Sequence, residues 1–109
     1  MSSTKLSFNP LTGTLTTVDL NTTSDNRLKT EIEKITNPID VLEQIDGVKF
    51  KWITSRKLSY GVIAQELEKI LPELVTTDDK GYKSVNYLGI IAFLIEAVKC
   101  QQNQINNLK

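Results

Sequence analysis

The chain is organised around Thr23-Ser24-Asp25-Asn26-Arg27-Leu28-Lys29, a stretch that separates two parts of different character. Residues 1–23 are rich in Thr, Ser and Asn and carry almost no charge, whereas residues 24–109 show the charges and apolar periodicity of a globular domain. The same stretch holds a nucleophile, Ser24, and a base, Lys29. A lysine amine can activate a serine hydroxyl where burial or nearby positive charge lowers the lysine pKa. We therefore predict a domain boundary before Ser24 and treat Ser24 and Lys29 as a candidate catalytic pair.

An ordinary helix start is a second interpretation of this stretch. Ser24 or Asp25 is a favourable N-cap residue, and apolar residues follow at helical spacing: Leu28, Ile32 and Ile35. Five residues of separation place two side chains about 140° apart around a helix and on opposite faces of a strand. Ser24 and Lys29 can therefore meet only if the chain bends between them or if they come from different protomers.

Composition limits what the chain can do. With 109 residues, 39% of them hydrophobic, it can build one modest domain whose core is marginal without a partner. Thirteen basic residues balance thirteen acidic ones, so we expect no nucleic-acid partner. The absence of histidine and the single cysteine remove the common zinc sites, the Ser-His-Asp triad and an intrachain disulfide. We expect no metal and no other cofactor.

No membrane association is expected either. The longest apolar run, residues 88–98, is interrupted by Glu96 and is too short to cross a bilayer, and the polar N-terminus does not resemble a signal peptide. We therefore expect a soluble, intracellular protein.

The pattern of residues 5–85 predicts short helices and short strands, hence an α+β fold. The expected strands cover residues 5–8, 14–20, 48–53, 60–63, 73–77 and 82–85, and the expected helices begin at Pro38 and Ala64. Gly47 is expected to close the first helix. Val48, Phe50 and Trp52 alternate with charged residues, which predicts a buried face with Trp52 in the core.

The C-terminal segment predicts a long helix that forms a coiled coil. Apolar residues and one glutamine follow one another at alternating spacings of three and four: Leu88, Ile91, Ile95, Val98, Gln102 and Ile105. Packing of a lone helix on its own domain would explain the first half equally well. The end at residues 101–109 is too polar to be covered by a small core, which favours self-association. Gln102 would then fix the register at some cost in stability.

Five ordered blocks carry a resemblance to a known family. They are SDNRLKTEI at 24–32, GVKFKW at 47–52, YGVIAQELEKILPELV at 60–75, DDKGYKSVNY at 78–87 and LIEAVK at 94–99. Together they resemble the intramolecular chaperone of phage tail spikes and tail fibres, also called the peptidase S74 or endosialidase-chaperone domain. The resemblance covers residues 24–109, and residues 1–23 resemble the end of a fibre or spike shaft.

This resemblance implies a homotrimer that sets the register of the preceding shaft and then releases itself. The implied cut lies between Thr23 and Ser24, and the implied activity is that of a single-turnover, self-cleaving serine endopeptidase. In that scheme Ser24 attacks the carbonyl of Thr23, Lys29 is general base and then proton donor, and water hydrolyses the ester. The implied location is the host cytoplasm during virion assembly, as the precursor of a tail component.

Four further residues are candidate supporting residues. Asp25 and Arg27 match the family motif; we expect them to orient the bend, and Arg27 to favour a neutral Lys29 by like-charge repulsion. Gln65 and Glu66 lie at the start of a predicted helix, where a carboxylate also gains from the helix dipole alone.

Three other functions stay open from the sequence. A non-cleaving trimerisation cap would share the helix and leave Ser24 as an N-cap. A membrane-bound transcription factor also releases its N-terminal part with this kind of domain, and a downstream transmembrane helix, absent from this sequence, is expected there. A small-molecule enzyme is disfavoured, because no glycine-rich loop or paired acid and base is visible.

Overall fold

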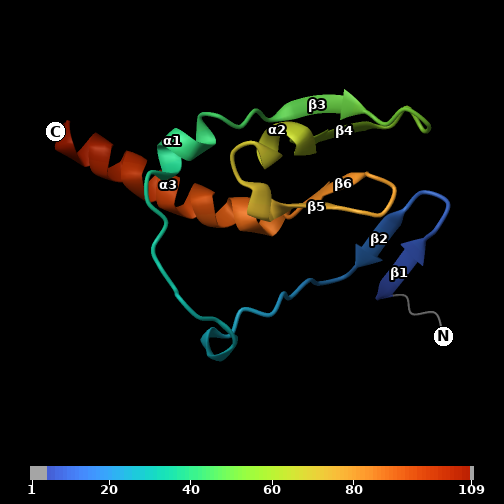
Figure 1. Cartoon of the computed structure of the whole chain (residues 1–109), viewed down its shortest axis with the longest axis horizontal. Helices are drawn as coiled ribbons and strands as arrows, with labels where there is room; N and C mark the ends of the chain where they lie inside the picture. Colours follow the sequence, from blue (N-terminus) through green and yellow to red (C-terminus); the bar gives the residue numbers. More distant parts are fainter. Residues whose placement is uncertain (1–4, 109) are drawn as a thin grey trace. The chain divides into compact units, whose positions relative to one another are not determined.

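The structure is a computed structural model that describes residues 5–108, and its α+β class is the expected one (Figure 1). The strands are β1 (Leu6–Asn9), β2 (Thr14–Thr17), β3 (Val48–Lys51), β4 (Leu58–Gly61), β5 (Val75–Thr77) and β6 (Lys83–Val85). The α-helices are α1 (Pro38–Leu42), α2 (Ala64–Glu68) and α3 (Tyr87–Asn107), and single 3-10 turns cover η1 (Asn26–Leu28) and η2 (Pro72–Leu74). The chain divides into two compact units, one ending at Glu33 and the other beginning at Lys34.

The first unit contains the β1–β2 hairpin. The two strands are antiparallel, with Phe8 opposite Leu15, and Gly13 closes the turn at φ +72° with its amide bonded to the Asn9 carbonyl at 2.7 Å. Leu6, Phe8 and Leu15 share one face of the hairpin, because residues opposite each other and residues two apart point the same way. All three are exposed. The hairpin therefore has an apolar face with no core of its own.

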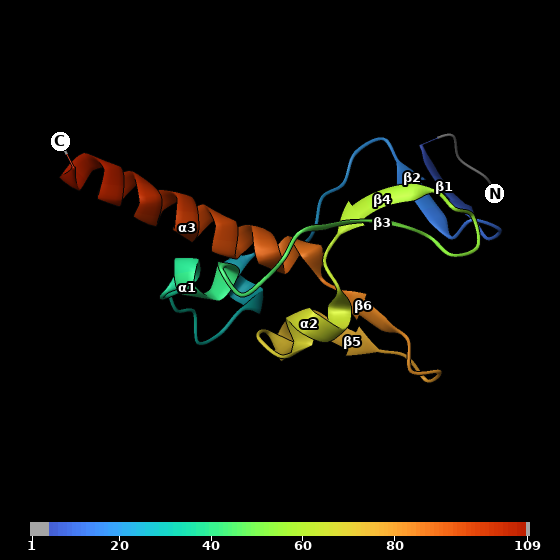
Figure 2. The same cartoon turned by 90° about the horizontal axis from the view of Figure 1, so that it is seen from above.

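The second unit has a small core. The buried residues of the described chain are Pro38, Leu67, Leu71 and Ala97, which come from α1, from α2 and the turn after it, and from α3. In the two views α1 lies along α3, and α2 lies beside the β5–β6 hairpin (Figure 2). Four buried residues provide little apolar burial for a domain of this size, in line with the marginal core expected from length and composition.

The beginning of α3 is tied to the rest of the second unit by specific contacts. The Asn86 side chain caps the helix by accepting from the Gly89 amide at 3.3 Å, and the Tyr87 hydroxyl accepts from the Val62 amide at 3.1 Å. A Cβ at Gly61 would collide with that Tyr87 phenol, so glycine is required for this close approach. These contacts fix the position from which α3 projects.

The predicted hairpin forms as β5 and β6, with its first strand shortened because residues 72–74 form η2. The Asp78 carboxylate accepts from the Lys80 and Tyr82 amides at 2.9 Å each, and Gly81 adopts φ +89°. The aspartate therefore serves the turn.

Several local predictions are wrong, and the strand predicted over 14–20 ends at Thr17. Strand β3 ends at Lys51, and Trp52 is 56% exposed because β3 and β4 form a two-stranded ribbon with no layer over that end; its ring packs edge-on against Phe50, with centroids 5.0 Å apart. Helix α1 ends at Leu42, well before Gly47. The backbone hydrogen bonds that follow span three residues instead of four, such as that from the Ile45 amide to the Leu42 carbonyl. The predicted strand over 60–63 is shifted and becomes Leu58–Gly61.

Helix α3 has two apolar faces with different surroundings. One faces its own unit, packs with α1, and holds half-buried and buried residues: Ile90, Phe93, Glu96, Ala97 and Cys100. The other is the seam of alternating threes and fours, and its apolar members are exposed by 48% at Leu88 and Ile91, 55% at Ile95, 62% at Val98 and 51% at Ile105. Packing within the second unit therefore does not account for the seam, and the C-terminal end of α3 extends past α1 (Figure 1).

Candidate active site

The predicted nucleophile and base are in contact within a single chain. The Lys29 Nζ donates a hydrogen bond to the Ser24 Oγ over 2.7 Å. The chain bends between them through the single 3-10 turn η1, held by bonds from the Leu28 amide to the Asp25 carbonyl and from the Lys29 amide to the Asn26 carbonyl. Lys29 itself is extended, at φ −117° and ψ 151°. The sequence left open a bend within one chain or a pair formed between protomers, and the structure shows the bend.

Asp25 holds the bend together. Its carboxylate accepts from the Arg27 backbone amide at 2.9 Å, which caps η1, and from the Arg27 Nε and Nη2 at 3.1 and 2.8 Å. The Arg27 side chain, followed by its backbone amide, holds the pKa of Asp25 below its ordinary value. Asp25, rather than Ser24, is therefore the N-cap. The helical interpretation fails beyond one turn, because no helix follows until Pro38.

The 2.7 Å separation of Lys29 Nζ and Ser24 Oγ is short enough for direct proton transfer between them. A neutral Lys29 amine at 2.7 Å from Ser24 Oγ would accept the hydroxyl proton instead of donating one. Thr23, Ser24 and Lys29 are all exposed in the single chain. The contact thus supplies the reach that general-base catalysis needs, at a place that is open to solvent in the single chain.

The other candidate supporting residues lie as follows. Arg27 is engaged by Asp25, so its contacts favour a role in the bend over repulsion of the Lys29 charge. Gln65 and Glu66 are exposed residues of the first turn of α2, in the second unit. Their participation stays a prediction.

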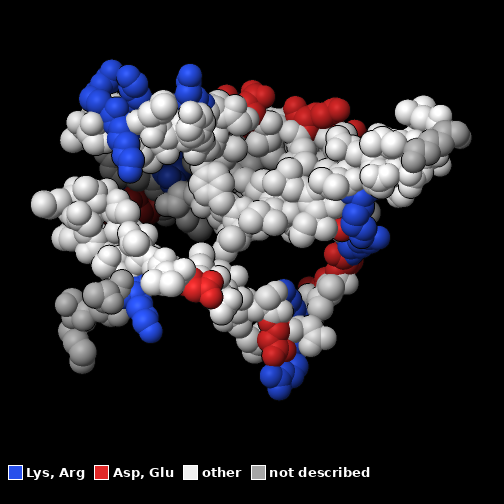
Figure 3. All heavy atoms as spheres, turned by 180° about the vertical axis from the view of Figure 1, so that it is seen from behind, with Lys and Arg blue, Asp and Glu red and all other residues white. Residues whose placement is uncertain are grey.

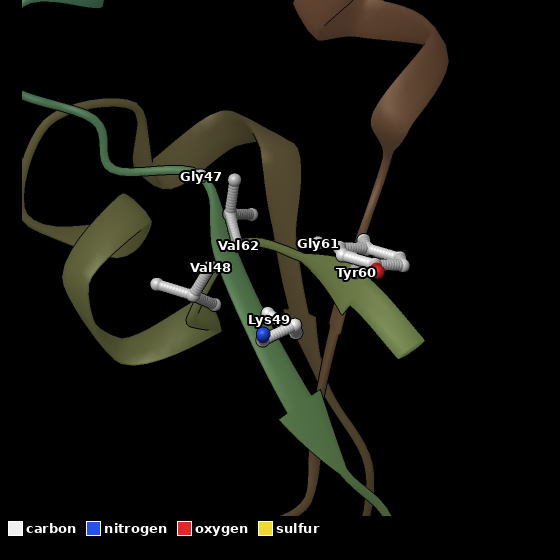
Figure 4. Close-up of a pocket in the computed structure, with 6 residues that line it drawn as sticks. All are labelled: Gly47, Val48, Lys49, Tyr60, Gly61 and Val62. Atoms are coloured by element: carbon white, nitrogen blue, oxygen red, sulfur yellow. The ribbon is translucent and has the colours of Figure 1, made fainter. Parts of the chain in front are cut away.

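A shallow hollow lies elsewhere in the second unit. It has a volume of about 510 Å³ and is lined by residues of the β3–β4 ribbon and its ends: Gly47, Val48, Lys49, Tyr60, Gly61 and Val62 (Figure 4). None of these is a predicted site residue. Among residues 5–108 no group of three or more His, Cys, Asp or Glu side chains is arranged to hold a metal ion. No described helix is long and apolar enough to cross a membrane.

The depressed pKa of Asp25 gives the bend a pH dependence. Because the folded pKa lies below the ordinary value of 3.8, the stabilisation is complete above that value and is lost as the pH falls through the folded one. An NMR titration of the Asp25 carboxyl carbon in the Ser24→Ala chain is expected to give a midpoint below 3.8, and Arg27→Gln is expected to raise it. Equal midpoints in the two proteins would contradict the proposed role of Arg27.

Comparison with known proteins gives a family match and several relatives. Residues 24–76 match the model of the family described as Peptidase_S74, chaperone of endosialidase. Long tail fibre protein Gp37 of Salmonella phage S16 is 37% identical over 102 residues, which cover 84% of this chain and 14% of that protein. Gp37 of Enterobacteria phages K3 and T2 are each 37% identical over 95 residues, covering 79% of this chain and 8% and 7% of those proteins. The chain thus spans a small part of the relatives' length.

The family match begins at Ser24, the residue that forms the contact with Lys29. The match of residues 24–76 to the chaperone-of-endosialidase model confirms the resemblance noted in the sequence. The relatives are phage long tail fibre proteins, and together the two findings support a chaperone domain of a phage tail fibre.

Proposed function

We propose that this chain trimerises and registers the end of a phage tail fibre and then releases itself by cutting the Thr23–Ser24 bond. The observation that carries the proposal is the 2.7 Å contact between Lys29 Nζ and Ser24 Oγ at the first residue of the family match. Residues 1–23 would be the end of the shaft, and residues 24–109 the removable domain. The proposed setting is the host cytoplasm during assembly of the virion, with no nucleic-acid or membrane partner.

The proposed trimer rests on the seam of α3. Its residues alternate as a and d positions of a heptad, with Leu88, Ile95 and Gln102 at a and with Ile91, Val98 and Ile105 at d. β-Branched residues at d with Leu or Ile at a favour three or four strands over two. The apolar residues of the seam are exposed in the single chain. Figure 3 shows one face of the molecule, on which charged side chains form separate groups among uncharged ones, polar and apolar alike. A second and third copy would cover the seam.

The proposed chemistry uses only the chain's own groups. Ser24 Oγ attacks the carbonyl carbon of Thr23 through a five-membered ring while Lys29 Nζ takes the hydroxyl proton. The Thr23–Ser24 carbon–nitrogen bond breaks, and the Lys29 ammonium returns the proton to the departing Ser24 amine. The Thr23 acyl group is then an ester on Ser24 Oγ, and water hydrolyses that ester to leave a carboxylate on Thr23 and a free hydroxyl on Ser24.

The domain would first align the three chains of the shaft, and its removal would then stabilise the folded shaft. Strand register in repetitive β sequence is weakly specified, so the three chains need an aligned start. A three-stranded coiled coil provides that start at one end. Once the shaft has folded, release of the domain removes the route back to the unfolded chains, and the fibre becomes kinetically stable.

The proposal is tested on the purified chain by two measurements. Light scattering of the Ser24→Ala chain is expected to give the mass of a trimer, and denaturing mass spectrometry of the wild-type chain is expected to give a fragment of residues 24–109. A monomer that stays uncut at high concentration would overturn the proposal. An uncut trimer would leave the runner-up, a non-cleaving trimerisation cap, which the open surroundings of Ser24 and Lys29 also permit.

Gln102 gives a separate prediction about register. It is the polar residue at an a position, and its Nε2 donates to the Asn106 Oδ1 at 3.1 Å. Gln102→Ile is expected to raise the thermal midpoint of the trimer, since an apolar residue replaces an amide in the seam, while relaxing its specificity of register. Circular dichroism measures the first, and disulfide trapping of cysteines at staggered seam positions measures the second. A lower midpoint would show that Gln102 is outside the seam.

A further inference from the structure

The segment that joins the candidate site to the second unit has few attachments. Within the described chain, residues 30–36 neither donate nor accept a backbone–backbone hydrogen bond. Glu31 adopts φ 51°, in the left-handed region, and Ile35 is half-buried. Among residues 5–108 the polar attachment of this segment is one ion pair, from Lys34 Nζ to Glu96 Oε1 on α3, at 3.8 Å.

Glu96 is an unusual residue on α3. It lies on the face directed toward its own unit, beside the buried Ala97, and its side chain is only 17% exposed. A carboxylate this enclosed needs cationic partners. It has two, Lys34 from the joining segment and Lys99 one turn along the same helix, whose Nζ lies 3.3 Å from Oε2. Lys99 can satisfy Glu96 within the helix, so the Lys34 pair is an additional link between two distant parts of the sequence.

We infer that the Lys34–Glu96 ion pair is a tether that holds the Ser24–Lys29 site close to the assembling helix α3. Lys34 and Glu96 are positioning residues in this inference and take no part in bond cleavage. The inference rests on the proposed function, because it matters for catalysis only if assembly of α3 completes the site.

Chain length sets the range of the tether. Lys29 lies five residues before Lys34, so their Cα atoms can be no more than about 18 Å apart. In this inference the half-buried Ile35, which directly follows Lys34, is released together with the ion pair. The next buried residue is then Pro38, nine residues from Lys29, and the limit becomes about 32 Å. The tether therefore almost halves the length over which the site can move away from α3.

A longer connection lowers the effective concentration of the site at the assembled helices. That concentration falls roughly as the −3/2 power of connection length, so an increase from five to nine residues is expected to slow cleavage about two- to three-fold. Lys34 is 74% exposed, and the stabilisation by an exposed ion pair corresponds to a rate change of this order.

The first test measures the segment itself and does not depend on cleavage at Ser24. In the Ser24→Ala chain, a glutamate-specific protease is expected to cut after Glu31 faster in Lys34→Gln and Glu96→Gln than in the parent. Lys99→Gln is the matched control, because it removes the other cationic partner of Glu96 and leaves the Lys34–Glu96 pair in place. In this variant the protease is expected to cut after Glu31 at the rate seen in the parent chain. The exchanged pair Lys34→Glu with Glu96→Lys is expected to restore the parent rate. Parent rates in both single variants would overturn the inference.

The second test measures self-cleavage in chains confirmed to be trimeric. Glu96→Gln and Lys34→Gln are each expected to slow release of the 24–109 fragment about two- to three-fold, and the double variant is expected to be no slower than either. Wild-type rates in the single variants, or additive losses in the double variant, would overturn the tether. If the wild-type chain is never cut, the proposed function fails, and the protease test alone decides whether the tether exists.

Discussion

Ser24→Ala and Lys29→Ala are each expected to abolish release of the fragment that begins at Ser24. The first removes the oxygen that attacks the Thr23 carbonyl, and the second removes the amine 2.7 Å away that would take its proton. Each loss is expected to exceed about a thousand-fold, because the residues act as one unit. The measurement is intact mass under denaturing conditions after timed incubation of the purified chain.

The contact within one chain adds a sharper outcome for the same pair. If each chain provides both groups, trimers assembled from a mixture of Ser24→Ala and Lys29→Ala chains remain uncut, since no chain has both residues. A pair shared between neighbours would restore cutting of the Lys29→Ala chains, which retain Ser24. Cleavage in the mixed trimers would therefore contradict catalysis within a single chain. Thr30→Ala is a suitable control, because Thr30 follows the site and makes no hydrogen bond within the described chain.

Ile95→Asp is expected to disrupt the assembly more than any other single change in α3. Ile95 is an a position in the middle of the seam, and the trimer would enclose three carboxylates there without cationic partners. The concentration needed for half-assembly is expected to rise at least about a hundred-fold. Sedimentation equilibrium on the Ser24→Ala chain measures this change, and release of the fragment from the otherwise wild-type chain is expected to stop with it.

A matched control comes from the same helix. Asn103→Asp introduces the same charge at an exposed b position, away from the seam, and is expected to leave assembly unchanged. Equal disruption by both changes would point to the charge of the helix rather than to burial in its seam. Undisturbed assembly of the Ile95→Asp chain would show that these residues face solvent in the functional protein.

The sequence predicted the parts of the fold that depend on local signals. The Asp78–Gly81 turn and the Pro38 start of α1 formed because aspartate, glycine and proline act through the backbone of their immediate neighbours. Trp52 was placed wrongly, because alternation shows which residues share a face but not whether anything covers it. Gly47 was placed wrongly because α1 stops after five residues, which periodicity does not reveal.

The same contrast holds for the site. Ser24 and Lys29 could be chosen as residue types, and the need for a bend followed from their spacing, but the turn that supplies it depends on Asp25 capping η1 and binding Arg27. The Lys34–Glu96 pair joins positions 62 residues apart, as 96 minus 34 shows, and a pair so distant has no periodic signal in one sequence. The seam of α3, by contrast, could be recognised from the sequence, because a heptad repeat is itself a local pattern.

The central claim is that assembly of α3 switches on cleavage by a pair that each chain already holds. The most direct measurement is the rate constant for release of the 24–109 fragment as a function of chain concentration, across the range in which light scattering shows the trimer forming. The account predicts negligible cleavage of the monomer and a first-order rate constant that rises to a plateau with the trimer fraction. A rate constant that is the same at every concentration, or cleavage that is complete in the monomer, would contradict it.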